Sequence, residues 1–537
     1  MRSRAGVRIR IIVAGACAFA AYVLMNHLML SDIIDHFYER EVYKSVIYVL
    51  WLLCGFALLM AFMATAPRAL LAAGVLIFLA SLVTNYAYMV ISRRPLSLDV
   101  MEWLPHEMSQ LPHAWSEFSQ EIVWAIVKAA VFIAVLLAAR AVMRRDEGLS
   151  KLLVPRRSWL VAGGAFVTFH TTAAIVQPPQ MMAETNILVF GVPALFASTP
   201  DLRPVPVAPS REALAQKIVL VVDESVTYAI YRQIVAPTLR GPAPVDFGEA
   251  ASVANCSAAS NALLRWGVEK SRVGTPGYDP RTNPTIWAYA KAAGYRTSLI
   301  DGQSDGAMQN YLGTKEFALI DEFVPARAGI DSDRGIADKI NEILRRPGPA
   351  FVYVVKRGIH FPYEMNYPKG ELPAGAARAE KYARAVSYAN DGFFTRVAAG
   401  VDFSRALLIY TSDHGQDLAE RSTHCNPDPR DVEYSVPLVA VTRAPALLDL
   451  LRTADGMLNR ASHLNIFPTL LYAFGYSRDW LEAEYGPTLA GPASPYLVYV
   501  SLGWQGPAAA RNRHTVDTSE FVKSVEFPRR GGGSAAP

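Results

Sequence analysis

The sequence predicts an α/β protein in which a bundle of five transmembrane helices precedes a larger domain, built on a mainly parallel sheet that helices cover. Two observations support this fold class. Of the 537 residues, 52% are hydrophobic and only 19% are charged, and the long uncharged runs lie in the N-terminal part of the chain. Further along, short β-branched runs alternate with helical patterns, and this alternation is typical of parallel sheets.

Five apolar runs account for the expected bundle, because a bilayer core is crossed by about 20 apolar residues. The runs are residues 11–30, 45–65, 69–92, 122–139 and 159–176. The fourth contains Lys128, and the fifth contains His170 and several threonines. A cleaved signal peptide is the alternative for the first run, but more apolar runs follow it and it has no clear small-residue cleavage site. We therefore expect residues 1–176 to form a transmembrane domain.

The charged residues between these runs predict the orientation of the bundle. Acidic residues dominate the first and third loops, whereas cations dominate the N-terminus and the second and fourth loops. These cations are Arg2, Arg4, Arg8, Arg10, Arg68, Arg140, Arg144, Arg145, Lys151, Arg156 and Arg157. Because positively charged loops face the cytoplasm, an odd number of spans places the rest of the chain outside. We expect a multi-pass protein of a bacterial inner membrane with its large domain in the periplasm.

Three segments follow the bundle. Residues 177–210 are rich in proline and include an apolar patch at 187–196, so we expect a linker along the membrane surface, with a solvated coil as the alternative. Residues 211–527 form the large domain, with strands expected at 217–222, 295–300, 351–355, 406–410 and 436–441 and helices at 286–293, 336–346 and 376–397. Residues 528–537 are small and are expected to be a flexible tail.

Composition excludes several functions. The net charge is only +4 and no long basic stretch occurs, so a nucleic-acid partner is not expected. Four cysteines without CxxC spacing exclude a disulfide-dense scaffold, a zinc ribbon and a c-type haem site. Any bound metal must therefore use other ligands.

Two expected strands end in groups that can hold a metal ion. The first is followed by Glu224, and the strand at 406–410 is followed by Asp413 and His414. In parallel sheets, functional residues gather at the carboxyl ends of strands. Two carboxylates, an imidazole and a hydroxyl suit Zn²⁺ or Mn²⁺. The alternative for each motif alone is a turn capped by Asp and Ser.

The chain resembles the lipid A phosphoethanolamine transferases of the alkaline phosphatase and sulfatase superfamily. The resemblance rests on residues 217–225, 255–260, 354–368, 410–415 and 462–470 together with His424. It implies an alkaline phosphatase/sulfatase-like fold for the large domain, and a single Zn²⁺ (or Mn²⁺ or Mg²⁺). The implied metal ligands and nucleophile are Glu224, Ser257, Asp413 and His414, with Ser257 in place of the family's threonine.

The resemblance also implies the reaction. A phosphoethanolamine group is expected to pass from phosphatidylethanolamine to Ser257, and then to lipid A, lipopolysaccharide or another envelope glycan. His360 and His424 correspond to histidines that contact the phosphate. Ser252 and Ser260 compete with Ser257 as the nucleophile, because a hydroxyl becomes reactive only when it is activated. We expect a membrane-embedded monomer.

Departures from the family leave other functions open. Asp223 precedes the ligand glutamate, where the family has glycine. The segment at 301–306 keeps Asp305, a candidate substrate-binding residue, but the lysine that follows in the family is missing. A phosphoglycerol transferase that uses phosphatidylglycerol, a membrane-bound phosphatase or phosphodiesterase, and a non-catalytic scaffold are the alternatives. A formylglycine sulfatase is disfavoured, because its Cys/Ser-x-Pro-x-Arg signature is absent around Ser257.

Cys256 and Cys425 are the cysteines outside the apolar runs, and each adjoins a proposed site residue. An external domain permits disulfides. We therefore hypothesise that the two form a disulfide that fixes the turn of the nucleophile against the loop of His424.

Overall fold

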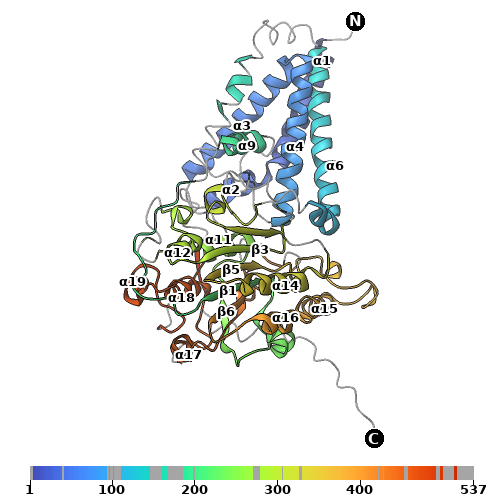
Figure 1. The fold of residues 1–537 in the computed structure, drawn as a ribbon. Coiled ribbons are helices and arrows are strands. Elements are labelled where there is room, and N and C mark those ends of the chain that lie inside the picture. The colour runs from blue at the N-terminus through green and yellow to red at the C-terminus, as the bar shows by residue number, and fades with distance from the viewer. Residues whose placement is uncertain are drawn as a thin grey trace. The chain divides into compact units, whose positions relative to one another are not determined.

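The computed structural model divides into two compact units, residues 1–105 with 114–197 and residues 106–113 with 198–537. Each unit is described by itself (Figure 1). The structure describes residues 4–38, 42–92, 96, 101, 111–145, 160–161, 163–166, 168–169, 185–196, 200–269, 272, 278–304, 306, 308–325, 329–420, 423–426, 429–452, 457–491, 496–499 and 513–516. The predicted tail at 528–537 lies outside these residues.

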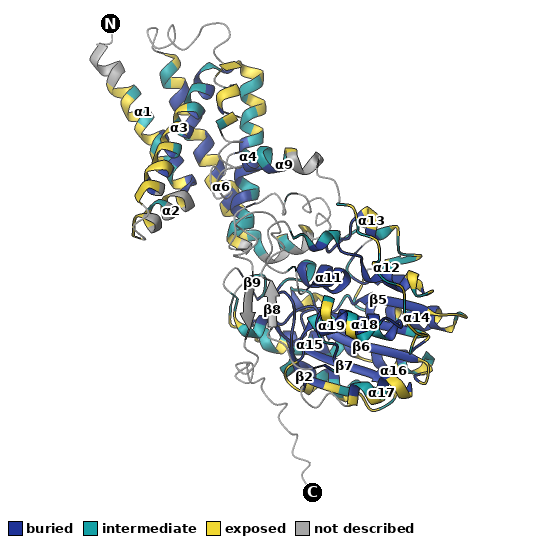
Figure 2. Cartoon of the chain, turned by 90° about the vertical axis from the view of Figure 1, so that its left-hand side faces the viewer, coloured by how far each residue is buried: buried dark blue, intermediate teal, exposed yellow. Residues whose placement is uncertain are grey.

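The first unit is helical. Its helices are α1 (Arg4–Met25), α2 (His27–Tyr38), α3 (Val42–Thr65), α4 (Arg68–Ser92), α6 (Leu111–Arg144) and α9 (Asn186–Phe196). Three stretches of the described chain, Ser45–Thr65, Arg68–Val90 and Phe118–Arg144, are long and apolar enough to cross a membrane. They coincide with the second, third and fourth predicted runs. Exposed residues run along these helices (Figure 2) and include many large hydrophobic side chains, as a lipid-facing surface requires.

The first predicted span differs from the structure. Helix α1 ends at Met25, and α2 begins at His27. Between them, the side-chain amide of Asn26 donates to the carbonyl of Tyr22 at 3.1 Å, and this local bond accompanies the break between the helices. The apolar helix before the break is therefore Ile9–Met25. Of the fifth run, the structure describes only 160–161, 163–166 and 168–169 as helical, so a count of five spans stays a prediction.

Within the segment expected to be a linker, residues 186–196 form α9, which packs on α4. The Asn186 side chain donates to Asn85 Oδ1 at 2.7 Å, and the backbone N–H of Ile187 donates to the Ser81 hydroxyl at 3.2 Å. These bonds satisfy polar groups at the start of α9, where a helix has unpaired N–H groups.

A seven-stranded sheet forms the centre of the second unit. Its strands are β1 (Lys217–Asp223), β2 (Val245–Ala251), β3 (Arg296–Asp301), β4 (Glu322–Pro325), β5 (Ala350–Val355), β6 (Ala406–Ser412) and β7 (Ser435–Thr442), in the order β2-β7-β6-β1-β5-β3-β4. From β6 to β4 all neighbours are parallel, whereas β7 is antiparallel to both of its neighbours. The five predicted strands are present, and β2 and β4 are additional. Outside this sheet, β8 (Tyr496–Tyr499) pairs with β9 (Arg513–Val516).

Helices cover both faces of the sheet (Figure 1). One face packs under α11 (Ser257–Trp266), α12 (Ile286–Ala292), α17 (Pro445–Arg452), α18 (Ile466–Ala473) and α19 (Arg478–Glu484). The other packs under α14 (Ser332–Arg345), α15 (Arg378–Asn390) and α16 (Phe393–Gly400). Shorter helices are α10 (Tyr228–Ile230), α13 (Thr314–Phe317), Tyr231–Val235, Ala236–Thr238, Pro280–Thr282, Tyr363–Met365, Asp431–Glu433 and His463–Asn465.

The helix predicted at 376–397 is two helices in the structure. Gly392, in the left-handed conformation at φ 72°, lies between α15 and α16. Glycine adopts this conformation without a steric cost, so the chain can turn there while both segments keep their apolar faces on the sheet.

Alternation along the strands explains why both faces are buried. In β1, Ile218, Leu220 and Val222 belong to the core under α12 and α18, whereas Val219 and Val221 belong to the core under α14 and α15. Side chains of a strand point to opposite faces in turn. A continuous apolar strand therefore fits the sheet only because both faces are covered.

Replacing Ile409 in β6 tests this packing. Ile409 has no exposed surface, so Ile409→Ala is expected to lower the free energy of unfolding by about 2–5 kcal/mol through lost burial and a residual cavity. Thermal unfolding of the purified chain measures the effect. Leu458→Ala, at a side chain that is 60% exposed, is the control. Equal melting temperatures for the two variants would contradict the assignment of Ile409 to the core.

Candidate metal centre and nucleophile

The candidate site lies where β1 and β6 end side by side. These strands are parallel neighbours, and Asp223 is paired with Ser412 at their last shared position. The backbone N–H of Asp413 donates to the carbonyl of Asp223 at 2.9 Å. The next residues, Glu224 on one strand and Asp413 and His414 on the other, therefore leave the sheet at the same carboxyl edge.

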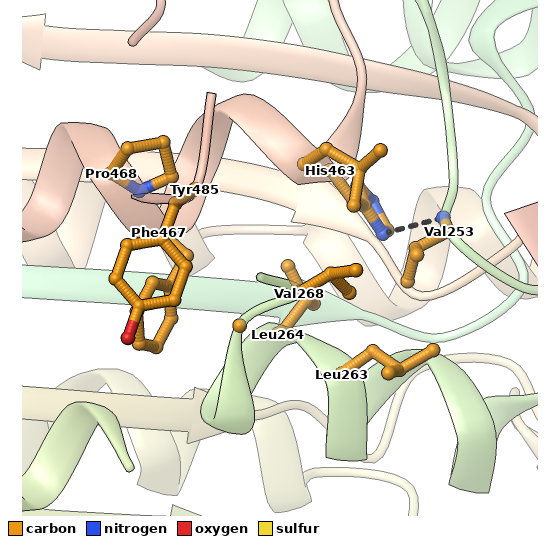
Figure 3. Close-up of a pocket in the computed structure, with 10 residues that line it drawn as sticks. Val253, Leu263, Leu264, Val268, His463, Phe467, Pro468 and Tyr485 are labelled. Carbon is orange, nitrogen blue, oxygen red and sulfur yellow. Dashed lines mark hydrogen bonds between the residues drawn. The ribbon is translucent and has the colours of Figure 1, made fainter. Parts of the chain in front are cut away.

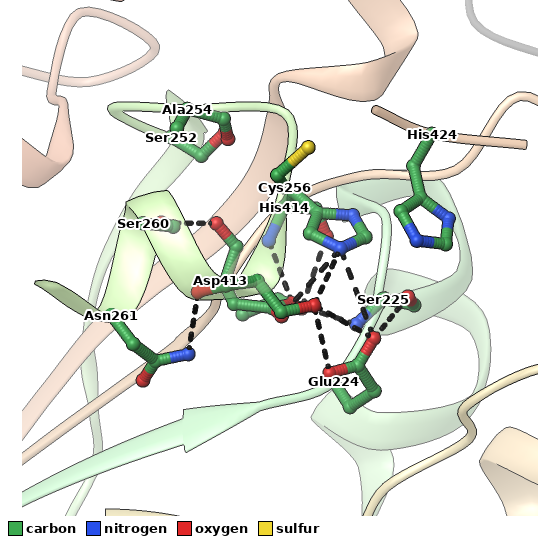
Figure 4. Close-up of polar contacts among 12 residues, drawn as sticks. Glu224, Ser225, Ser252, Ala254, Cys256, Ser260, Asn261, Asp413, His414 and His424 are labelled. Carbon is green, nitrogen blue, oxygen red and sulfur yellow. Dashed lines mark hydrogen bonds and ion pairs between the residues drawn. The ribbon is translucent and has the colours of Figure 1, made fainter. Parts of the chain in front are cut away.

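Glu224, Asp413 and His414 converge in a buried cluster (Figure 4), as the two motifs predict. One possible ligand atom from each lies within 4.8 Å of the others. His414 Nε2 is 3.8 Å from Glu224 Oε1 and 3.6 Å from Asp413 Oδ2. Two carboxylates and one imidazole at this spacing form a ligand set that suits a divalent metal ion.

Neighbouring groups orient these three side chains. The Nδ1 atom of His414 is 2.7 Å from the Gly415 carbonyl; donation to this acceptor leaves the lone pair of Nε2 directed at the carboxylates. Asp413 Oδ1 accepts from the backbone N–H groups of Ser225 and His414 at 2.9 and 2.8 Å. No N–H or hydroxyl donor among the described residues reaches the buried Oδ2. A buried carboxylate oxygen without a donor, facing a second carboxylate, fits a bound cation.

The electrostatics of the cluster agree with this interpretation. Burial, and then the charge of Glu224, raises the pKa of Asp413 to about 7. Burial also raises the pKa of Glu224. Two buried carboxylates repel each other when both are ionised, and a divalent cation between them favours the charged forms.

Ser257 is the first residue of α11, and its hydroxyl faces the cluster. Its Oγ lies 3.1 Å from His414 Nε2 and 3.3 Å from Glu224 Oε2. The competing serines point elsewhere: Ser260 donates to the Asp413 carbonyl at 2.5 Å, and Ser252 donates to the Ala254 carbonyl at 2.8 Å. Of the three, Ser257 alone places its hydroxyl among the candidate metal ligands.

His360 and His424 lie beside the cluster. The rings of His414 and His424 stack with centroids 4.4 Å apart, and those of His424 and His360 are 6.5 Å apart (Figure 4 labels His414 and His424). Burial lowers the pKa of His360 and sets that of His424 well below its usual range. Burial of the two rings therefore favours their neutral forms.

Both ring nitrogens of His463 are bonded to neighbouring residues outside the cluster. Its Nδ1 accepts from the backbone N–H of Val253 at 3.3 Å, and its Nε2 lies 3.0 Å from the Thr411 hydroxyl. Burial lowers its pKa to about 3. His463 also lines a small apolar pocket with Phe467 and Tyr485 (Figure 3), whose interior of about 10 Å³ is the size of one water molecule. This pocket is too small for a lipid or glycan substrate.

The hypothesised disulfide between Cys256 and Cys425 is confirmed, with an S–S distance of 2.04 Å. It joins the residue before Ser257 to the residue after His424. The N–H of Cys425 donates to the Asn255 carbonyl at 2.8 Å. Glu433, which the sequence gave no reason to select, accepts from the side chains of Asn255 and Asn426 at 2.9 Å each. The two loops are therefore held together by covalent and hydrogen bonds.

Asp223, the acidic residue beside Glu224, does not join the metal cluster. Its carboxylate pairs with Lys356 Nζ at 2.6 Å and accepts from the Tyr410 hydroxyl at 2.9 Å. The Lys356 side chain is fully buried, so the pair neutralises Asp223 inside the protein. Asp223 Oδ1 accepts from the backbone N–H of Glu224 at 3.0 Å, which fixes the start of the metal-binding segment.

Sequence reasoning missed Gln303, whose side chain donates to Glu224 Oε2 at 2.7 Å and to the Lys356 carbonyl at 3.1 Å. Its place directly after β3, at the same edge of the sheet, was the available signal. The candidate substrate-binding residue Asp305 lies outside the described residues.

Parts of the chain are similar to known proteins. Residues 249–476 match the sulfatase family. A curated relative, the Kdo(2)-lipid A phosphoethanolamine 7''-transferase of Escherichia coli (strain K12), is 24% identical over 172 residues, which cover 27% of this chain and 30% of that enzyme. The match therefore spans less than a third of either protein.

Solved structures show similar folds over more of the chain. The integral membrane protein lipooligosaccharide phosphoethanolamine transferase A of Neisseria meningitidis aligns with a TM-score of 0.56 at 15% identity, over 89% of this chain and 98% of that chain. The C-terminal periplasmic domain of EptC from Escherichia coli, in complex with Zn, aligns with a TM-score of 0.44 at 17% identity, over 59% of this chain and 97% of that one.

Removing one carboxylate tests the metal centre. Asp413→Asn is expected to weaken zinc binding about tenfold or more, because a charged ligand is lost. Metal analysis of the full chain after gel filtration in detergent measures it. Asp321→Asn, at a half-exposed carboxylate paired with Lys291, is the control and should keep its zinc. Full zinc content in Asp413→Asn would remove Asp413 from the ligand set.

Gly358 offers a second test. A Cβ at this position lies 2.4 Å from the Glu224 Cβ, so Gly358→Ala should displace Glu224 and reduce zinc content. Gly370→Ala is the matched control, because Gly370 also has a positive φ but a Cβ there meets nothing within 4 Å. Both variants carry the cost of a left-handed alanine, about 1–2 kcal/mol. Equal zinc content in the two would show that Gly358 does not position Glu224.

Proposed function

We propose that the chain, which carries a sulfatase-family domain and has the fold of a phosphoethanolamine transferase, is a metal-dependent transferase of the bacterial inner membrane. It moves phosphoethanolamine from phosphatidylethanolamine to Ser257, and from Ser257 to lipid A, lipopolysaccharide or another envelope glycan. The observation that carries the proposal is the Ser257 hydroxyl, 3.1 Å from His414 Nε2 in the acidic cluster.

Zinc fits the proposed ligands Glu224, Asp413, His414 and Ser257, with Mn²⁺ or Mg²⁺ as alternatives. A bound Zn²⁺ lowers the pKa of a coordinated hydroxyl and offsets charge on phosphoryl oxygens. The buried Asp413 Oδ2, which has no hydrogen-bond donor among the described residues, supports a cation at this place.

The protein residues supply the positions and proton carriers of the first half-reaction. Ser257 Oγ attacks the phosphorus, a bond forms between them, and the bond to the diacylglycerol oxygen breaks. The hydroxyl of Ser257 loses a proton and the leaving oxygen gains one. His360 and His424, neutral because burial lowers the pKa of each, are suited to carry this proton.

In the second half-reaction, an acceptor hydroxyl or phosphate attacks phospho-Ser257. A bond forms between the acceptor oxygen and the phosphorus, the bond to Ser257 Oγ breaks, and Ser257 regains a proton. The backbone around Ser257 stays fixed, because Asn261 donates to the Ser257 carbonyl at 3.0 Å and the Cys256–Cys425 disulfide holds the preceding residue. A fixed nucleophile lowers the entropic cost of each attack.

The helices of the first unit suit a lipid donor. Three of the described helical stretches are long and apolar enough to cross a membrane. We propose a multi-pass monomer whose catalytic domain, within residues 211–527, lies in the periplasm. A donor lipid then reaches the enzyme by diffusion within the bilayer, and its acyl chains need not enter water.

The alternatives fit the site less well. A superfamily phosphatase that uses two metals needs further histidine ligands, but His463 is already bonded to Val253 and Thr411. One metal-ligand cluster is present among the described residues. In a non-catalytic scaffold, no function would require the candidate metal ligands to lie close to the Ser257 hydroxyl. Phosphatidylglycerol remains the alternative donor within the same chemistry.

Ser257→Ala tests the proposal. After expression in a membrane that contains phosphatidylethanolamine, intact-mass spectrometry of the wild type should show a phosphoethanolamine adduct on Ser257, with diacylglycerol among the lipid products. Ser257→Ala should lose both, with activity reduced about 10⁴-fold or more, as for other covalent nucleophiles.

Ser252→Ala is the matched control, because the Ser252 hydroxyl is bonded to the Ala254 carbonyl, and it should keep the adduct. A phosphoglycerol adduct on Ser257 would identify phosphatidylglycerol as the donor in place of phosphatidylethanolamine. Diacylglycerol release that persists in Ser257→Ala would contradict Ser257 as the nucleophile.

A further inference from the structure

Arg357 occupies a distinctive place beside the candidate metal centre. It follows β5 by two residues, at the same carboxyl edge of the sheet as Glu224 and Asp413. Its backbone is tightly enclosed: a Cβ on Gly302 would lie 2.3 Å from the Arg357 nitrogen, and a Cβ on Gly358 would lie 2.4 Å from the Glu224 Cβ. The segment that carries Arg357 therefore crosses directly beside a metal-ligand residue.

The two consecutive cations of this segment have different surroundings. Lys356 is fully buried and neutralised, with Nζ 2.6 Å from Asp223 and 2.8 Å from Asn390 Oδ1. The side chain of Arg357 makes no ion pair or hydrogen bond with the described residues, and its Nε is buried without an acceptor. Asp333 accepts the backbone N–H groups of Arg357 and Gly358, at 2.9 and 3.2 Å, and no side-chain N–H of Arg357. Buried polar groups are nearly always bonded, so the buried Nε of Arg357 is an exception.

The face of the sheet indicates what Arg357 can reach. Along β5, Val352 and Val354 belong to the core under α14, and Lys356 continues this series. Arg357 follows Tyr353 and Val355, which belong to the opposite core. The Tyr353 hydroxyl lies 3.1 Å from Asn261 Oδ1 of α11, the helix that begins at Ser257. Val355, two residues before Arg357, thus ends β5 on the face that α11 covers.

Charge supports an anionic ligand at this position. Burial lowers the pKa of His360, and the positive charge of Arg357 lowers it further. Glu224 and Asp413 carry two negative charges, which a divalent cation balances. A substrate phosphate then brings charge that the cluster does not compensate. The guanidinium fork suits phosphate oxygens, to which it can donate two parallel hydrogen bonds.

We propose that Arg357 binds a phosphate oxygen of the substrate during transfer. This inference rests on the proposed transferase function and adds a binding residue to which the resemblance assigns no role. The phosphate belongs either to the phospholipid donor or to a phosphorylated acceptor, and both present the same oxygen chemistry.

Inorganic phosphate is the probe that tests binding without catalysis. Isothermal titration calorimetry of the zinc-loaded full chain in detergent compares the wild type with Arg357→Gln and Arg357→Lys. We expect affinity to fall about tenfold or more in Arg357→Gln and less in Arg357→Lys, which keeps the charge but not the fork. Arg452→Gln, at an exposed arginine of α17, is the control and should match the wild type.

Three results would overturn the proposal. The first is equal phosphate affinity in Arg357→Gln and the wild type, and the second is no phosphate binding by the zinc-loaded wild type. The third is loss of zinc from Arg357→Gln, which would make Arg357 a support of the metal centre instead. Zinc content and melting temperature are therefore measured on every variant.

Kinetic measurements on Arg357→Gln show whether the bound phosphate belongs to the phospholipid donor or to the acceptor. If Arg357 binds the donor, Arg357→Gln raises KM for phosphatidylethanolamine in vesicles about tenfold and changes kcat little. If it binds the acceptor, diacylglycerol release is unchanged and phospho-Ser257 persists longer. If the wild type releases no diacylglycerol at all, the proposed transferase function fails, while the phosphate titration still decides the role of Arg357.

Discussion

The parallel pairing of β1 with β6 is the constraint on which the candidate site depends. Because Asp223 and Ser412 are partners in this register, the residues that follow bring Glu224 and Asp413 together in a buried space. Two carboxylates in such a space are unfavourable without a cation. The burial of both, the imidazole of His414 and the donor-free oxygen of Asp413 together describe a centre that a metal ion completes.

The charged side chains around the site lie in three different surroundings. The buried Lys356 side chain neutralises the carboxylate of Asp223, which also accepts a hydrogen bond from the Tyr410 hydroxyl. At the edge, Glu224, Asp413 and His414 form a group that could hold a cation. At the same carboxyl edge of the sheet, the buried Nε of Arg357 has no acceptor among the described residues. The proposed divalent metal ion and an anionic substrate group would both be balanced at this edge, and phosphoryl transfer requires this combination.

Sequence reasoning reached the parts of the structure that depend on local pattern. The apolar runs of β1, β5 and β6 identify strands without ambiguity, and the motifs that follow β1 and β6 identify the metal cluster. The sequence could not show that β7 runs antiparallel, because a strand buried on both faces reads alike in either direction. It also missed β2 and β4, and the break after Met25, where Asn26 interrupts an otherwise continuous apolar run.

Residues that act through tertiary contacts were the hardest to find. Gln303 and Glu433 carry no motif, and only the fold brings them to Glu224 and to the loop of Asn255. Sequence reasoning selected His360 but not Arg357, because only the structure shows that the buried Arg357 Nε has no acceptor among the described residues. The Cys256–Cys425 pairing, by contrast, was accessible from sequence because both cysteines adjoin proposed site residues.

X-ray absorption at the zinc edge, measured on the zinc-loaded full chain, tests the central claim most directly. The account predicts one zinc ion per chain, bound by one imidazole nitrogen and by oxygen ligands at about 2.0–2.2 Å, with no sulfur ligand. Loss of the imidazole signal in His414→Ala would assign that ligand. A spectrum with sulfur or with several imidazoles, or a chain that binds no stoichiometric zinc, would contradict the proposed centre and the activation of Ser257 that depends on it.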